Sequence, residues 1–456
     1  SPSAIAALSS AQVAAFTAGQ VSQMTADQWR SMSSAAFLGL TPQAILGVDA
    51  EDLAVVASDH VLALSSQQLA GIRAEAFAGL GSATISTFSM AQLRGISSSG
   101  IAAFDVSQVG GFAPSQMAAL SKSQIGSIRG TPFESGQSQV SAGAPIAALR
   151  IGAVSMLSSV QLSGLVSAQV GSLLGEQLGA ISPSALRGVP AEALVALSAD
   201  QVSALSSVQV ASLTAAQVAA IASPRGDGGV DPSVRTNVFN GLRSEVLGVL
   251  SSAQLGEWEA GSLATISRGH LSSIPPSAFG GLRPEVLVGM DPGEVSLFSS
   301  AHVSAFSGEQ VAAILYHNAA ALGTGAVASL TSAQFSSVAS TPYPYAAWGD
   351  RSNDWFRRGM NSLGSAQIGA LSTGVVSALT SRQLAGLGPD GIAGLSAVQL
   401  GALRTVQVVG LSRQQIDALS GVQRSSLSTA VKGFLSDTYL AALEGRQNPM
   451  TVDLRN

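Results

Sequence analysis

The chain has 456 residues, a formal net charge of −5 and only 11% charged residues. This negative balance and the presence of only two lysines, Lys122 and Lys432, argue against a nucleic-acid groove, which needs a basic stripe. No apolar run reaches the roughly 18 residues of a membrane span. The absence of cysteine excludes disulfides and thiolate metal sites.

An eight-residue apolar period begins at the first residues of the chain. Apolar residues occupy every eighth position from Leu8 to Ile128, and a second series runs three places ahead, from Ile5 to Ile125. We number the octad so that these two apolar residues stand at positions five and eight. A repeat this regular is typical of a solenoid scaffold rather than of a globular catalyst.

Each octad carries the signature of a helix N-terminus. Position one is usually Ser, Thr or Asp, which are good N-cap residues, and position four is often Gln, which gives the capping box Ser/Thr-x-x-Gln. Position eight of the preceding octad and position five then form a hydrophobic staple across the cap. The sequence therefore predicts a new short helix in every octad. The glutamines at position four include Gln12, Gln20, Gln28, Gln68, Gln92, Gln108, Gln116 and Gln124.

Proline supports this register because it is tolerated at the first helical position, where no N–H is needed. The prolines at octad position two are Pro2, Pro42, Pro114, Pro183, Pro276, Pro284, Pro292 and Pro389. The period argues against one continuous helix, since an eight-residue repeat drifts by about 80° per octad around a helix axis. A β-solenoid stays open as the alternative, although the Ala-rich octads have poor strand propensity.

The octad register restarts three times along the chain. Position seven is small almost throughout, so we expect successive helices to approach closely. Helices this short are unstable alone and need stacked neighbours. The predicted fold is an all-α solenoid of about fifty very short helices. The predicted organisation is octad block 1 (1–128), a loop (129–148), block 2 (149–221), a loop (222–241), block 3 (242–338), an aromatic insert (339–362), block 4 (363–443) and a C-terminal tail (444–456).

Two of the interruptions contain candidate binding residues. Segment 222–241 includes Arg225, Gly226 and Asp227, an Arg-Gly-Asp tripeptide of the kind that integrins bind. It is a weak candidate, because tripeptides arise by chance and a plain connecting loop is the preferred interpretation. Segment 339–362 concentrates aromatic and arginine side chains, a composition typical of interface hot spots, and we interpret it as a candidate protein interface. The alternative is that its aromatics fill the mismatch between blocks 3 and 4. The candidate interface residues are Tyr343, Tyr345, Trp348, Trp355, Phe356, Arg357 and Arg358.

The sequence offers no recognisable catalytic motif. There is no phosphate-binding Gly-Lys-Ser/Thr loop, no His-Glu-x-x-His and no nucleophile elbow. His60, His270 and His302 stand at octad position four, where Gln is usual, so we expect them to begin helices; His317 has no clustered partner. We expect the protein not to be an enzyme and to need neither cofactor nor metal.

Units such as Leu205–Leu213, which reads Leu-Ser-Ser-Val-Gln-Val-Ala-Ser-Leu, resemble the Leu-Ser/Thr-x-x-Gln-Val-x-x-Leu octapeptide repeats of bacterial large exoproteins and adhesin-like surface proteins. The resemblance covers most of the chain. It implies a structural role outside the cell or at its surface and implies no catalytic residues.

The function that we expect is a structural subunit that self-associates into an extracellular filament, sheath or surface layer. A surface poor in charge favours such self-association. The alternative is an adhesin that presents a loop to a host or neighbouring-cell ligand, and a weaker one is an intracellular peptide-binding scaffold. The expected partners are further copies of the chain and, under the alternative, other surface components, without nucleic acid or a membrane span.

Overall fold

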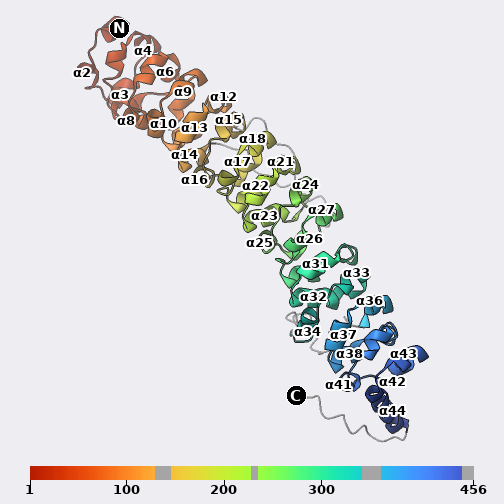
Figure 1. Ribbon diagram of the computed structural model, residues 1–456. Coiled ribbons are helices and arrows are strands. Elements are labelled where there is room, and N and C mark those ends of the chain that lie inside the picture. The colour runs from red at the N-terminus through yellow and green to blue at the C-terminus, as the bar shows by residue number, and fades with distance from the viewer. Residues whose placement is uncertain (129–144, 227–234, 341–360, 444–456) are drawn as a thin grey trace. The chain divides into compact units, whose positions relative to one another are not determined.

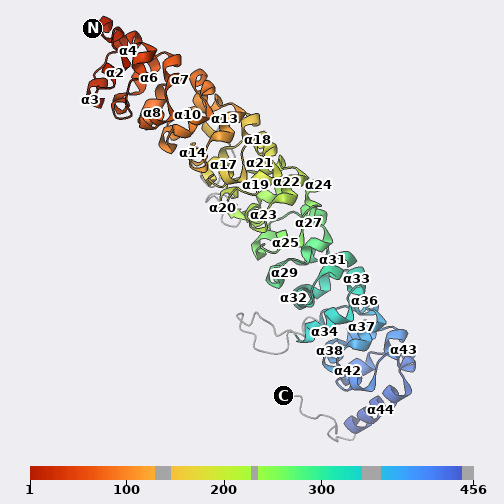
Figure 2. The ribbon, with the colours of Figure 1, turned by 60° about the vertical axis from the view of Figure 1, so that its left-hand side comes forward.

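The computed structural model describes residues 1–128, 145–226, 235–340 and 361–443, within two compact units, Ser1–Val249 and Leu250–Asn456. In each unit short helices follow one another in chain order (Figures 1 and 2).

The helices of the first unit are α1 (Pro2–Ala6), α2 (Ser10–Val13), α3 (Ala18–Val21), α4 (Ala26–Ser31), α5 (Ser34–Phe37), η1 (Ala44–Gly47), α6 (Ala50–Val55), α7 (Ser58–Ala63), α8 (Ser66–Gly71), η2 (Ala74–Gly79), α9 (Ser82–Thr87), α10 (Met90–Gly95), α11 (Ser98–Ala102), α12 (Val106–Gly110), α13 (Pro114–Ala119), α14 (Lys122–Ser127), η3 (Pro145–Ala148), α15 (Ile151–Val154), α16 (Ser159–Leu162), α17 (Ser167–Ser172), α18 (Gly175–Ala180), α19 (Pro183–Leu186), α20 (Ala191–Leu194), α21 (Ala199–Ser203), α22 (Ser207–Ser212), α23 (Ala215–Ala222), η4 (Val238–Gly241) and α24 (Ser244–Leu247), where η marks a 3-10 helix.

The helices of the second unit are α25 (Ser252–Leu255), α26 (Ala260–Leu263), α27 (Arg268–Ser273), α28 (Pro276–Phe279), α29 (Pro284–Val288), α30 (Pro292–Val295), α31 (Ser300–Ala305), α32 (Gly308–Asn318), η5 (Ala319–Ala321), α33 (Thr324–Ala328), α34 (Ser332–Ser340), α36 (Ser365–Ala370), α37 (Thr373–Ala378), α38 (Ser381–Gly386), α39 (Pro389–Ala393), α40 (Ala397–Gly401), α41 (Thr405–Val408), α42 (Arg413–Asp417), α43 (Gly421–Ser426) and α44 (Thr429–Leu443).

The all-α solenoid predicted from the octads is confirmed in both units. The strands in the described residues are β1 (Arg225–Gly226) and β2 (Arg235–Thr236), which pair antiparallel with Arg225 opposite Thr236. This two-residue ladder does not build a β-solenoid, so the alternative fold is wrong.

The predicted capping boxes form in the structure. At the start of α10, the N–H of Ser89 donates to Gln92 Oε1 at 2.9 Å, and the N–H of Gln92 donates to Ser89 Oγ at 3.3 Å. The staple across Ser65, the N-cap of α8 one turn earlier, consists of Leu64 and Leu69, and both are buried. Prolines begin α1, α13, α19, α28, α29, α30 and α39 as expected, whereas Pro42 precedes η1, which begins only at Ala44.

Three octads make one turn of the solenoid. Helices three octads apart contact each other, as α8 contacts α10 and α16 contacts α19. The small residue at position seven therefore meets the helix one turn away rather than the successive helix that the sequence suggested. A Cβ on Gly79 would collide with the carbonyl oxygen of Ala50, and one on Gly39 with that of Ser10.

The glutamine at position four also joins adjacent turns, a role that the capping box does not predict. Gln92 Nε2 donates to the carbonyl oxygens of Leu62 at 2.8 Å and Leu64 at 2.9 Å, and Leu64 directly precedes the N-cap of α8. We call these bonds the inter-turn clamp. The glutamines that bond the carbonyl 28 residues earlier are Gln68, Gln92, Gln108, Gln116, Gln124, Gln177, Gln201, Gln209, Gln217, Gln310, Gln334, Gln399, Gln407, Gln415 and Gln423.

The clamp continues across two of the register breaks. Gln161 Nε2 donates to the carbonyl of Leu120, 41 residues earlier, at 2.7 Å. Gln367 Nε2 donates to the carbonyl of Leu322, 45 residues earlier, at 2.7 Å. The turns before and after segments 129–144 and 341–360 are therefore stacked on each other, and the extra residues do not interrupt the solenoid.

Candidate functional site

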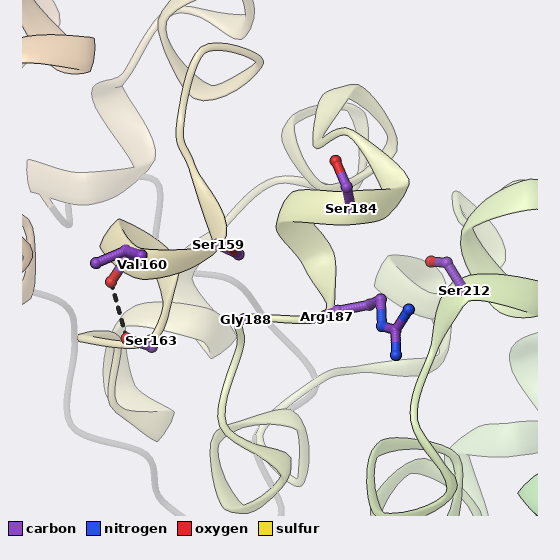
Figure 3. Close-up of a pocket in the computed structure, with 7 residues that line it drawn as sticks. All are labelled: Ser159, Val160, Ser163, Ser184, Arg187, Gly188 and Ser212. Atoms are coloured by element: carbon purple, nitrogen blue, oxygen red, sulfur yellow. Dashed lines mark hydrogen bonds between the residues drawn. The ribbon is translucent and has the colours of Figure 1, made fainter.

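An open groove of about 700 Å³ lies on the outer surface of the first unit, where α16, α19 and α22 stack (Figure 3). These helices belong to three successive turns. We call it the Arg187 groove. It is lined by Ser159, Val160, Ser163, Ser184, Arg187, Gly188 and Ser212.

Octad geometry explains why the groove forms. Gly188 stands at position seven, and a Cβ there would collide with the carbonyl oxygen of Ser159. The absence of that Cβ lets the end of α19 approach the start of α16. Small serine side chains at the surrounding positions leave the surface hollow between the turns.

Arg187 is the charged residue of this groove. Ser163 Oγ donates to the carbonyl of Val160 at 2.8 Å, and Ser212 Oγ donates to the carbonyls of Gln209 at 2.7 Å and Pro183 at 3.0 Å. These hydroxyl protons are therefore used within the protein. Arg187 extends from α19 toward Ser212 (Figure 3) and forms no ion pair in the described part of the chain. The arrangement presents a guanidinium to an anionic group in solution.

A second cavity, of about 540 Å³, lies in the second unit between α42, α43 and α44. Buried leucines form part of its wall, and its cations are held by backbone carbonyls. Arg424 Nη2 donates to Asp417 O at 3.0 Å, and Lys432 Nζ donates to Ser425 O at 2.7 Å. Its lining residues are Ile416, Asp417, Leu419, Arg424, Leu427, Lys432, Leu435 and Ser436.

Most of the interface and adhesion residues predicted from the sequence lie outside the described residues. Arg225 and Gly226 form β1, whereas Asp227 lies outside the described residues. The aromatic candidates also lie outside the described residues, namely Tyr343, Tyr345, Trp348, Trp355, Phe356, Arg357 and Arg358. Both sites stay predictions.

The three histidines at position four lie in the first turn of α7, α27 and α31, as expected. His302 Nδ1 accepts from the N–H of Ser299 at 3.1 Å, and His270 Nδ1 lies 2.5 Å from Ser267 Oγ. Burial lowers the pKa of His302 below its ordinary value. His60 is buried and stacks on Phe37 with ring centroids 5.6 Å apart.

Two acidic residues also occupy position four. Glu294 Oε2 accepts from the N–H of Asp291 at 2.8 Å, and Asp52 Oδ2 accepts from that of Asp49 at 3.1 Å. Both carboxyls are buried, and burial raises the pKa of each. A carboxylate can complete the capping box but has no proton for the inter-turn clamp.

In the ranges that the structure describes, no three His, Asp or Glu side chains are grouped so that they could hold a metal ion. None of the helices within these described ranges is both long and apolar enough to cross a membrane.

Sequence reasoning missed the Arg187 groove and the inter-turn clamp. The groove has a weak signal, an arginine and a glycine side by side in otherwise uncharged octads. The clamp has a clearer one, because Gln is preferred over Glu at position four although both complete a capping box. That preference indicates a need for the amide protons.

The family model described as the ALTTAQ repeat matches residues 360–397. Within that range Ala378–Gln383 reads Ala-Leu-Thr-Ser-Arg-Gln, in which Leu379 is a staple residue, Thr380 the N-cap and Gln383 the capping glutamine. The chain is a repeat protein. No curated protein matches it.

Proposed function

We propose that this protein is a non-enzymatic structural subunit that self-associates into an extracellular filament, sheath or surface layer. The observation that carries the proposal is a set of exposed valines at octad position three. Val398 and Val422 lie on α40 and α43, which stack on each other in successive turns. The valines between 64% and 72% exposed are Val160, Val208, Val398, Val406 and Val422.

Exposed apolar side chains favour burial against another surface, and a chain with 11% charged residues has little electrostatic repulsion to oppose it. The same octad surface recurs on every turn, so a contact that suits one turn suits its neighbours. This repetition favours copies of the chain as partners, although other surface components could also bind.

The polar interior supports a structural rather than a catalytic role. Buried glutamines such as Gln209 and Gln310 bond to their own N-cap and to the turn below. Their hydrogen-bonding capacity is used in holding the stack together. We propose on this basis that the protein needs neither a cofactor nor a metal.

The test is a concentration series by negative-stain electron microscopy and sedimentation velocity. We expect ordered polymers or layers, and we expect Val398→Ser with Val406→Ser and Val422→Ser to raise the concentration at which they form. Gln414→Ser is the control, because Gln414 is an exposed polar residue at the same octad position. Persistent monomers of the unmodified protein at every concentration would overturn the proposal.

An adhesin is the second candidate. Its support is the antiparallel pairing of Arg225–Gly226 with Arg235–Thr236, which brings together the ends of the segment that contains the tripeptide. Cell attachment to protein-coated surfaces tests it. Attachment that Asp227→Glu abolishes would favour the adhesin, whereas equal attachment to both proteins would exclude this tripeptide as its ligand.

The aromatic insert is proposed as a further docking surface. Replacing Trp348 and Trp355 by Ala should abolish assembly or ligand binding while the helical circular-dichroism signal stays unchanged. Loss of the helical signal would instead show that these side chains hold the fold together.

A further inference from the structure

The Arg187 groove has a complementary surface on the same unit. We infer that it receives an acidic ridge of a second copy of this chain, where the acidic ridge is Asp27, Glu51 and Glu75. The inference rests on the proposed self-association and assigns it a specific contact.

The first step concerns the arginines at octad position six. Arg30 forms an ion pair with Asp27 at 3.0 Å, and Arg94 Nε donates to the carbonyl of Ala119 at 3.4 Å. Arg187 shares their octad position, but within the described residues it forms neither an ion pair nor a hydrogen bond to a backbone carbonyl. Its charge is therefore available to an anion that enters the groove.

The second step concerns the ridge. Asp27, Glu51 and Glu75 all stand at octad position three, in the first turn of α4, α6 and η2. These helices contact each other in successive turns, and all three side chains are exposed. The helix dipole favours carboxylates at this position, so the charges are stable there in the isolated chain.

The ridge is only partly neutralised within the protein. Asp27 has Arg30, and Glu75 lies 3.9 Å from Arg73. Glu51, the middle residue, forms no ion pair in the described part of the chain. The carboxylate of Glu51 on the ridge and the guanidinium of Arg187 in the groove therefore both lack an ion-pair partner within the described residues.

The third step places both features on one column of helices. We call a series of helices that contact each other from one turn to the next a column. One column runs from α4 through α6, η2, α11, α14, α16 and α19 to α22, and it contains both the ridge and the groove. Between them, α11 and α14 carry Ser99 and Ser123 at position three, which are small and uncharged. Two columns can therefore approach side by side, with the ridge of one copy against the groove of the other.

Charge reversal tests this contact in the full chain. Arg187→Glu alone and Glu51→Arg alone should each raise the concentration for self-association at least about tenfold, a change readily seen by sedimentation. The double variant should restore association, because the pair is re-formed with its signs exchanged. Arg150→Glu and Glu176→Arg are matched controls, since both residues are exposed, unpaired in the described residues and on a different column, that of α15 and α18.

Disulfide trapping gives an independent readout, because the chain has no cysteine of its own. A protein with Glu51→Cys mixed with one carrying Arg187→Cys should form a covalent heterodimer under mild oxidation. The heterodimer should exceed either homodimer. Equal yields of all three dimers would overturn the contact.

The failures of the two proposals are distinguishable. If the unmodified protein stays monomeric at every concentration, self-association itself is refuted. If it assembles, and Arg187→Glu with an unchanged circular-dichroism spectrum assembles equally well, the groove contact is refuted while self-association stands. Binding of an added acidic polysaccharide to the groove, with assembly unaffected by Arg187→Glu, would likewise overturn the inference.

Discussion

Gln92 and Leu64 lie in adjacent turns of the solenoid, and Gln92 Nε2 donates to the carbonyl oxygen of Leu64 at 2.9 Å. The same side chain accepts the N–H of Ser89 through Oε1 at 2.9 Å. One glutamine thus caps its own helix and satisfies a carbonyl in the turn below. Because carbonyls without a hydrogen bond are costly when buried, the amide is required at this position and not merely tolerated.

The clamp predicts that glutamines that make it contribute more to stability than glutamines that only cap a helix. Gln209 makes both the capping bond and the clamp, whereas the hydrogen bond of the Gln28 side chain is the one that its Oε1 accepts from the N–H of Thr25. We expect Gln209→Ala to lower the free energy of unfolding by about 2–4 kcal/mol and Gln28→Ala by about 0.5–1 kcal/mol. Urea unfolding followed by circular dichroism measures both, and equal losses would show that the clamp adds nothing to the cap.

The double change Gln209→Ala with Gln217→Ala extends this comparison. Capping alone predicts a loss of about 0.5–2 kcal/mol. Because Gln217 also donates to Leu186 and Val189, at 3.0 Å and 2.7 Å, we expect the loss to exceed that range. A result within the range would mean that the turns relax to satisfy the freed carbonyls.

Glu294 is a natural carboxylate at the clamp position, and its replacement by Gln should stabilise the second unit. Burial, chiefly, and the charge of Asp291 raise its pKa, while the hydrogen bond from the Asp291 N–H and the charge of Arg268 lower it. The net shift of this pKa is upward, so folding favours the protonated form. Stability from Glu294 is thus present below the ordinary glutamate pKa and is lost as pH rises through the higher pKa of the folded state. We expect Glu294→Gln to gain about 1–2 kcal/mol at pH 7, since an amide can donate where a carboxylate cannot.

The pH dependence is the check on that gain. The difference in unfolding midpoint between Glu294→Gln and the unmodified protein should shrink as pH falls toward 4, where the carboxyl is protonated. Glu285→Gln is the control, because Glu285 is acidic but stands at octad position three, in the first turn of α29. A gain that is the same at pH 4 and pH 7 would contradict the assignment to ionisation.

Sequence patterns predicted the local structure of this chain well because caps and staples are local. Ser89 and Gln92 lie three residues apart, and their capping box depends on that spacing alone. The predicted helix starts and buried positions followed from such spacings. Pro42 shows the limit, since its turn tightens into a 3-10 helix that begins two residues later.

The stacking and the groove could not be predicted in the same way. The distance of 28 residues between Gln92 and Leu64 depends on how many octads complete a turn, and no single octad encodes that number. The Arg187 groove needs helices from three turns, so its shape appears only once the turns are placed. The three-octad turn also explains why Gly79 faces Ala50 and not the next helix.

Close approach between turns predicts a sharp difference between glycines. A Cβ on Gly79 would collide with Ala50 O, so we expect Gly79→Ala to cost at least about 2 kcal/mol through displacement of the turn. Gly248 has open space around its Cα and helical backbone angles, so Gly248→Ala should stabilise by about 0.4–1 kcal/mol. Thermal unfolding of the two variants measures the contrast, and similar midpoints would show that the turns can separate without cost.

His302 should give a pH dependence of opposite sign to that of Glu294. Burial lowers its pKa, so folding favours the neutral ring. The stability that this contributes is present above the ordinary histidine pKa and is lost as pH falls through the lower pKa of the folded state. We expect His302→Gln to remove this loss, because Gln keeps the cap to Ser299 without titrating. Unfolding midpoints between pH 7 and pH 5 measure it, with His270→Gln as the control, since His270 is more exposed at the same octad position. If the midpoint of His302→Gln falls with acidification as steeply as that of the unmodified protein, the loss comes from another group in the second unit.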